Sequence, residues 1–324
     1  MRVVSLFAGA GGLDLGFIWA GHKIVWANDN FEDAVNTYRE NIGDHIVFGD
    51  IQGIRSDQIS DCDIVIGGFP CQGFSVANTS RHVNDTRNKL YREMLRVIKD
   101  KKPAFFLAEN VKGILNLGKG AILEKIMQDF QHASYIVKYR VLNAADYGVP
   151  QLRERVFFLG VRSDIGIQVA FPVATHADPS RGLHISRKQW VSIGDALGNI
   201  PEPEKAPEIP NHTYSKYKLR FNGYLGHRKI DPKKPAPTVT ARGDDRGGVV
   251  VLHHPGNHRR MSAREMAITQ SFPIDYVFSG TQSSVYRQVA NAVPPLLAKA
   301  LASQFPIEPW GIKNETARKA VPDI

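Results

Sequence analysis

Short apolar runs alternate with segments of helical spacing over residues 2–161. In two segments, apolar side chains recur every four residues, as on one helix face: Leu90, Met94 and Ile98, then Ile122, Ile126 and Phe130. We predict strands at 3–7, 23–28, 45–48, 62–68, 103–110, 136–143 and 155–161, and helices at 13–21, 31–41, 88–100 and 121–130. Several of the strands are apolar throughout, so both of their faces are buried. The pattern therefore predicts an α/β fold with a doubly wound, mostly parallel sheet.

The pattern changes after about Phe171, where prolines become frequent and apolar runs become short. Two brief strands are predicted at 238–241 and 248–254, among basic loops. Helices are predicted at 261–272 and 294–305, the second begun by prolines. Because a domain averages about 150 residues, a chain of 324 residues suits two domains, the second smaller and mostly β or irregular.

The chain has only two cysteines, too few for a disulfide framework, which indicates a reducing compartment. Asp14 and a glycine cluster interrupt the apolar N-terminal segment, so it does not resemble a signal peptide. No apolar run approaches the length of a membrane span. We therefore expect a soluble cytoplasmic protein that does not contact a membrane.

The net charge of +9 is concentrated in one segment. Residues 212–264 contain twelve Lys and Arg against three acids, which accounts for the whole excess of the chain. Such a segment suits a polyanion-binding surface. A merely solvated basic face is the alternative.

A glycine-rich turn, FAGAGG at 7–12, follows the first predicted strand and opens a helix. Glycines at this place let a ligand approach the backbone. Asp29 ends the second strand, the usual position of a carboxylate that holds ribose hydroxyls. Asp14 replaces the third glycine of the dinucleotide fingerprint, so the motif indicates a nucleoside-containing cofactor without separating NAD from S-adenosylmethionine. A tight turn with a surface aspartate is the alternative.

Cys71 lies on a glycine-rich loop after the fourth strand, in IVIGGFPCQGFS. That position faces the ligand side of an open α/β sheet and suits a nucleophile. Cys62, at the edge of the strand, is better explained as a buried inert residue. A reactive thiolate needs exposure and nearby positive charge, which Arg153 and Arg155 could supply. Glu109 ends the fifth strand, where it faces a ligand or caps a helix.

Six motifs follow one another in order: FAGAGG, GGFPCQ, ENV (109–111), QLRER (151–155), REMAITQSFP (264–273) and NAVPP (291–295). From residue 3 to about 304 this set resembles the DNA cytosine-5-methyltransferase family of bacterial restriction–modification systems. The resemblance implies an S-adenosylmethionine-dependent methyltransferase fold. Its catalytic and cofactor-binding domain would comprise 1–172 plus 276–324, and its target-recognition domain 173–275.

The resemblance also implies a reaction. Cys71 would add as a thiolate to C6 of a cytosine that is flipped out of duplex DNA, and C5 would take the methyl group from S-adenosylmethionine. A base would then remove the C5 proton, and elimination would release the thiol. Glu109 would contact N3 and the exocyclic amine, with its pKa raised by burial. Arg155 would bind O2, and Arg153 would contact substrate or orient its neighbours. The loop after Cys71, residues 73–89, would form a mobile lid.

The implied cofactor is S-adenosyl-L-methionine, with S-adenosyl-L-homocysteine as the product. Phe7 would stack on adenine and Asp29 would hold the ribose. Asn30 replaces a residue that is often aromatic in the family, which removes one expected packing contact with adenine, and Ala290 replaces a usual glycine, a milder change. The predicted cofactor set is Phe7, Ala8, Gly9, Ala10, Gly11, Gly12, Leu13, Asp29, Asn30, Asp50, Ile51, Pro70, Leu90, Asn291 and Ala292.

No metal is expected, because His253, His254 and His258 have no cysteine or paired acid nearby in sequence. The expected partner is double-stranded DNA with a short specific site, bound by a monomer, and a cognate restriction endonuclease is a functional partner. The alternatives are a transfer-RNA cytosine methyltransferase, a non-catalytic DNA-binding protein and an NAD-dependent oxidoreductase. The long basic segment argues against the transfer-RNA enzyme, and the retained Cys71 argues against the non-catalytic protein. The missing third glycine argues against the oxidoreductase.

The DNA contacts are predicted in the basic segment, at Lys233, Lys234, Thr238, Arg242 and Arg246. Arg242→Ala should cost about 1–3 kcal/mol and relax the preference at one base pair, because arginine pairs bidentately with guanine. Lys233→Ala or Lys234→Ala should weaken all DNA equally and lower the salt slope by about 1. Binding to the cognate site and to single-base variants at several salt concentrations separates the two behaviours. Uniform weakening by Arg242→Ala would identify a phosphate contact instead.

Overall fold

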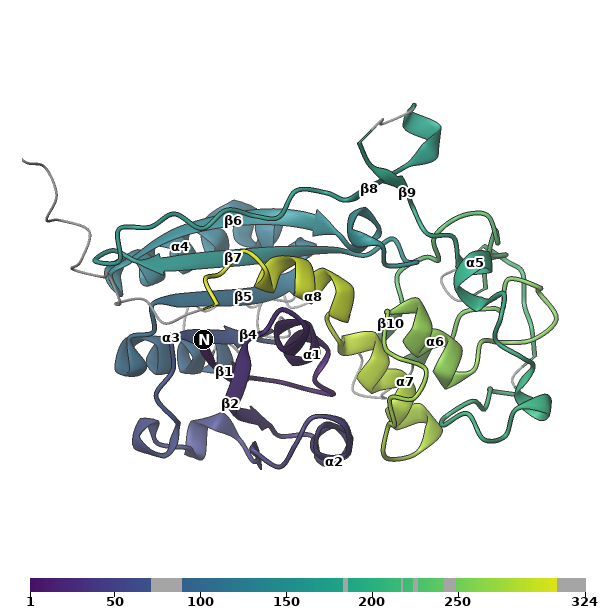
Figure 1. The fold of residues 1–324 in the computed structure, drawn as a ribbon, viewed down its shortest axis with the longest axis horizontal. Helices are drawn as coiled ribbons and strands as arrows, with labels where there is room; N and C mark the ends of the chain where they lie inside the picture. The colour runs from purple at the N-terminus through teal and green to yellow at the C-terminus, as the bar shows by residue number, and fades with distance from the viewer. Residues whose placement is uncertain (71–88, 183–185, 217, 224–226, 242–248, 308–324) are drawn as a thin grey trace, which may run out of the picture.

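The structure, a computed structural model, describes residues 1–70, 89–182, 186–216, 218–223, 227–241 and 249–307. A seven-stranded sheet in the order β3-β2-β1-β4-β5-β7-β6 forms its centre (Figure 1). All seven strands predicted from the apolar runs are present, and the α/β prediction is confirmed. They are β1 (Arg2–Leu6), β2 (Lys23–Asp29), β3 (Ile46–Phe48), β4 (Ile64–Gly67), β5 (Phe105–Val111), β6 (Tyr135–Asn143) and β7 (Glu154–Arg162).

The strand order reverses between β1 and β4, which are parallel neighbours although β2 and β3 lie between them in the chain. Strands β1 to β5 all run parallel, and only β7 runs antiparallel, between β5 and β6. A reversal of this kind leaves a crevice at the carboxyl ends of the two strands, where ligands bind in open α/β sheets. The topology therefore gives the position of the site.

Helices cover both faces of the sheet because its strands are apolar on both sides. Ile64 and Ile66 of β4 belong to one buried cluster, whereas Val65 between them belongs to the other. The first cluster is completed by α1 (Gly12–Trp19), α2 (Glu32–Asn41) and α8 (Pro295–Ala302). The second is completed by α3 (Lys89–Lys101) and α4 (Ala121–His132). No helix in the described ranges is long and apolar enough to cross a membrane.

A third buried cluster lies beyond the sheet and is formed mainly by α5 (Ile193–Leu197), α6 (Ala263–Thr269) and α7 (Gln282–Asn291), which lie together in Figure 1. The short strands β10 (Thr240–Ala241) and β11 (Val249–Val250) adjoin members of this cluster in the chain, whereas β8 (His176–Ala177) and β9 (Lys188–Gln189) contribute no residue to it. Helix α6 lies within the helix predicted at 261–272. Helix α7 was not predicted, although Thr281 caps it and Val285 and Val289 stand four residues apart on its buried side.

The C-terminal helix α8 packs directly on α1. A Cβ placed on Gly16 would lie 2.3 Å from the Cβ of Ala298 and 2.5 Å from the backbone nitrogen of Lys299. Only glycine permits this approach, so α1 and α8 pack tightly although they lie far apart in the sequence. The N-terminal ammonium also donates to the carbonyl of Ile307 at 2.6 Å.

Gly16→Ala should destabilise the protein by about 1–3 kcal/mol, because the clash with the backbone of α8 outweighs the gain of about 1 kcal/mol in helix propensity. Urea unfolding of both proteins measures the difference. Gly113→Ala is the matched control, since nothing lies within 4 Å of a Cβ at that position. A Gly16→Ala protein as stable as the original would show that α8 does not pack as described.

Candidate active site

A cavity of about 760 Å³ opens at the strand-order reversal between β1 and β4. Its walls come from the carboxyl ends of β1, β2, β4 and β5, from the residues after β3, and from the end of α7. Most of the predicted catalytic and cofactor-binding residues line this cavity, although they lie far apart in the sequence. These are Phe7, Ala8, Gly9, Ala10, Gly12, Leu13, Asp29, Asn30, Asp50, Ile51, Pro70, Leu90, Glu109, Arg153, Arg155, Asn291 and Ala292. Gly11, also predicted, is buried behind this wall.

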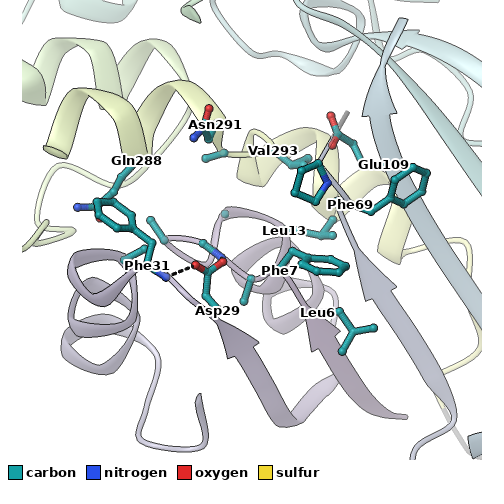
Figure 2. Close-up of a pocket in the computed structure, with 18 of the residues that line it drawn as sticks. Leu6, Phe7, Leu13, Asp29, Phe31, Phe69, Glu109, Gln288, Asn291 and Val293 are labelled. Carbon is teal, nitrogen blue, oxygen red and sulfur yellow. Dashed lines mark hydrogen bonds between the residues drawn. The ribbon is translucent and has the colours of Figure 1, made fainter. Parts of the chain in front are cut away.

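Asp29 organises one side of the cavity. Its Oδ2 accepts the Gly9 backbone N–H at 2.8 Å, and its Oδ1 accepts the Phe31 backbone N–H at 2.9 Å (Figure 2). Burial raises the pKa of Asp29, and these two N–H groups oppose the shift. Each carboxylate oxygen keeps a lone pair, so the side chain can still accept from two neighbouring hydroxyls.

The glycine-rich turn lines the cavity, and its backbone is strained at Phe7. Phe7 has φ +55°, in the left-handed region that only glycine adopts freely. A Cβ on Gly12 would lie 2.4 Å from the carbonyl oxygen of Val293, which follows α7. The turn therefore fits closely under the C-terminal segment. In Figure 2, Asn291 and Asp29 lie on opposite sides of the opening, with Phe7 beside Leu6.

Glu109 is fixed at the end of β5 by its neighbours. A Cβ on Gly68 would lie 2.9 Å from Glu109 Oε2, so glycine at this position leaves room for the carboxylate. The next side chain, Asn110, is buried and donates from Nδ2 to the carbonyl of Phe69 at 2.9 Å. This bond attaches the segment that leads to Cys71 to the end of β5. Asn110 was not among the predicted site residues.

Glu109 and Arg155 form an ion pair inside the cavity. Arg155 Nε lies 3.1 Å from Glu109 Oε1, and each side chain is only 13% exposed. Burial raises the pKa of Glu109, while the charges of Arg155 and Arg153 oppose the shift. The raised pKa agrees in direction with the requirement for an acid that can hold a proton near neutral pH. The pair comes from β5 and β7, which are adjacent strands.

Arg153 is directed toward backbone atoms of the protein. Its Nη1 donates to the carbonyl of Val239 at 2.8 Å, and its Nη2 donates to those of Ala290 and Ala292 at 2.9 and 3.0 Å. The side chain is fully buried. Of the two roles predicted for it, this geometry favours orienting its neighbours over contacting substrate.

Three of the predicted residues, Cys71, Arg242 and Arg246, lie outside the described residues, as does nearly all of the proposed lid at 73–89. The described DNA-contact candidates differ from one another. Lys233 and Lys234 are exposed and line neither this cavity nor the one next to it. Thr238 lines the adjoining cavity, and its hydroxyl donates to the carbonyl of Leu152 at 2.6 Å.

Two cavity residues that the sequence did not reveal are Phe31 and Arg287. The guanidinium carbon of Arg287 lies 3.9 Å from the centroid of the Phe31 ring, within cation–π distance. Phe31 is the residue after Asn30, so an aromatic side chain lines the cavity although Asn30 itself is polar. Arg287 stands one helical turn before Asn291, a spacing that could have identified it once α7 was recognised as a helix.

The three histidines that were considered for a metal have other partners. The rings of His254 and His258 are 5.0 Å apart, and His258 Nε2 lies 3.2 Å from Glu202 Oε1. His253 packs against Phe221, with 4.7 Å between the ring centroids. Within the part of the chain that the structure describes, no three His, Cys, Asp or Glu side chains are arranged to hold a metal ion.

Comparison with known proteins identifies the family. The C-5 cytosine-specific DNA methylase family matches residues 1–306. The type II methyltransferase M.NgoFVII of Neisseria gonorrhoeae is 40% identical, over 94% of this chain and 87% of the relative. The type II methyltransferase M.BsuRI of Bacillus subtilis is 35% identical, over 96% and 80%.

Solved structures agree with this assignment. A putative DNA modification methyltransferase encoded within an E. coli prophage superposes with a TM-score of 0.74 at 25% identity, covering 94% of this chain and 98% of that one. The Dnmt2 methyltransferase of S. pombe gives 0.68 at 21% identity, covering 94% and 97%, which is a likeness of fold. This chain therefore belongs to the C-5 cytosine-specific DNA methylases, and it is a DNA cytosine methyltransferase that uses S-adenosylmethionine.

Proposed function

We propose that this enzyme flips one cytosine out of a short specific site in duplex DNA and methylates it through a covalent adduct with Cys71. The observation that carries the proposal is the buried Glu109–Arg155 pair, 3.1 Å apart, in the same cavity as the glycine turn and Asp29. S-adenosylmethionine supplies the methyl group when bound. Protection of host DNA beside a cognate restriction endonuclease is the corresponding biological role.

Each described residue has a task in this scheme. Glu109, whose pKa is raised by burial, holds a proton on N3 of the cytosine while Cys71 adds to C6. Arg155 donates to O2, and it cannot act as a base because its guanidinium keeps its proton. Asn110 holds the Phe69 carbonyl, and so positions the start of the loop that carries Cys71.

The cavity suits the cofactor by size and by donor set. A volume of about 760 Å³ lies within the usual range for a ligand of that size. Asp29 offers acceptors for the ribose hydroxyls and Phe7 offers a ring for stacking, while Asp50 and Ile51 line the same cavity and would contact adenine. Phe31 adds an aromatic wall that Asn30 does not provide.

The division into a catalytic domain (1–172 plus 276–324) and a recognition domain (173–275) is part of the proposal. It is supported by the packing of α8 on α1. The third buried cluster joins residues of 193–272 to α7, so α7 packs against the proposed recognition domain although it follows residue 275. The described part of the basic segment supports duplex DNA as the partner. Thr238 of this segment lines a cavity that Arg155 also lines, which supports a DNA path beside the first cavity.

Asp29→Ala should weaken S-adenosylmethionine binding roughly ten- to hundredfold, because it removes a charge-assisted acceptor worth about 1.5–3 kcal/mol. Titration calorimetry measures the change. Asp57→Ala is a control, since that carboxylate is exposed and pairs with Arg55 outside the cavity. An unchanged affinity in Asp29→Ala would place the ribose contact elsewhere.

Cys71→Ser should abolish methyl transfer from tritiated S-adenosylmethionine while DNA binding survives, because the thiol serves chemistry and not docking. A duplex with 5-fluorocytosine at the target should trap a covalent complex with the original enzyme, since fluorine cannot leave as a proton does. Cys62→Ser is the control and should remain active, because burial raises the pKa of the Cys62 thiol to about 12. Substantial turnover by the Cys71→Ser enzyme would disprove the assignment.

A further inference from the structure

A second cavity, of about 540 Å³, adjoins the first at Arg155, which lines both. The segment before β10 also joins them, because Thr238 lines the second cavity and Thr240, two residues on, lines the first. Residues two apart along an extended segment project to the same side. Whatever enters the second cavity therefore lies directly beside Arg155 and its partner Glu109.

The second cavity offers an aromatic surface that is already held in place. Its lining includes Trp190, whose Nε1 donates to Asp146 Oδ1 at 2.9 Å. That bond satisfies the only polar group of the indole, so the ring presents only its π-surface to a ligand. Leu152, 39% exposed, adds an apolar wall. Flat nucleobases stack on such surfaces without regard to their sequence.

The lining also contains an exposed ion pair, in which another anion can replace the carboxylate. Lys112 Nζ lies 2.9 Å from Glu154 Oε2, with the two side chains 54% and 52% exposed. An ion pair this exposed contributes little to stability, so a phosphate can replace the carboxylate as the partner of Lys112. Glu154 would then be free to accept from an exocyclic base amine.

We propose that this cavity is a second nucleotide subsite, which takes the nucleotide adjoining the flipped cytosine on the same strand. Its base stacks on Trp190 and its phosphate binds Lys112. The inference rests on the proposed flipping of cytosine into the first cavity. It follows because a nucleotide joined to the flipped one by a single phosphodiester must lie next to Arg155, where the aromatic ring and the lysine are found.

The test uses the full-length enzyme and a duplex that contains its mapped methylation site. Trp190→Ala should weaken binding of this duplex about tenfold or more, the loss expected for one stacked base, and Trp190→Phe should restore most of it. The measurement is repeated on two duplexes in which the 5′ or the 3′ neighbour of the target cytosine is abasic. On one of these two duplexes, Trp190→Ala and the original enzyme should bind equally well.

Trp19→Ala is the matched control, because Trp19 is a half-buried tryptophan on α1 that lines neither cavity. It should bind all three duplexes as the original does. A loss in Trp190→Ala that is equal on all three duplexes, a failure of phenylalanine to restore binding, or no loss at all would overturn the subsite. Failure of the proposed function is distinguishable, because the unaltered enzyme would then transfer no methyl group to DNA.

Discussion

One buried guanidinium connects three parts of the chain around the active site. Arg153, the last residue of the β6–β7 connection, donates to the carbonyls of Val239, Ala290 and Ala292. Those carbonyls belong to the segment before β10 and to the end of α7, which are more than eighty residues away in sequence. A buried charge is tolerated only when it is hydrogen-bonded, so removing any of these segments would leave a costly unpaired group. The connection before β7, the segment before β10 and the end of α7 are therefore held together at this point.

The strands could be predicted from the sequence because each is apolar over most of its length and is bounded by polar or glycine-rich residues. Their order could not be predicted, since β7 lies between β5 and β6 through pairings that no local pattern specifies. Helix α7 was missed for a related reason. Its apolar residues, such as Val285, are few and lie among Ser and Gln, so its burial depends on α2 and α6.

Most of the candidate site was predictable because its residues belong to short ordered motifs. The motifs did not reveal which partner each side chain binds. Arg153 and Arg155 stand two residues apart in QLRER, yet one binds backbone carbonyls and the other binds Glu109. Phe31 and Arg287 belong to no recognised motif and meet only because α2 and α7 pack together. Ser284 Oγ donates to Asp33 Oδ2 at 2.5 Å and Thr37 Oγ1 donates to Gln288 Oε1 at 2.6 Å across this contact.

The first cavity holds charged side chains of both signs. It is lined by the carboxylates of Asp14, Asp29, Asp50 and Glu109 and by the guanidinium groups of Arg153, Arg155 and Arg287. Asp14 is fully buried, and burial raises its pKa to about 6 although Ser5 and Tyr38 donate to it at 2.9 Å. A sulfonium cofactor is cationic, so its arrival favours the ionised form of such a carboxylate.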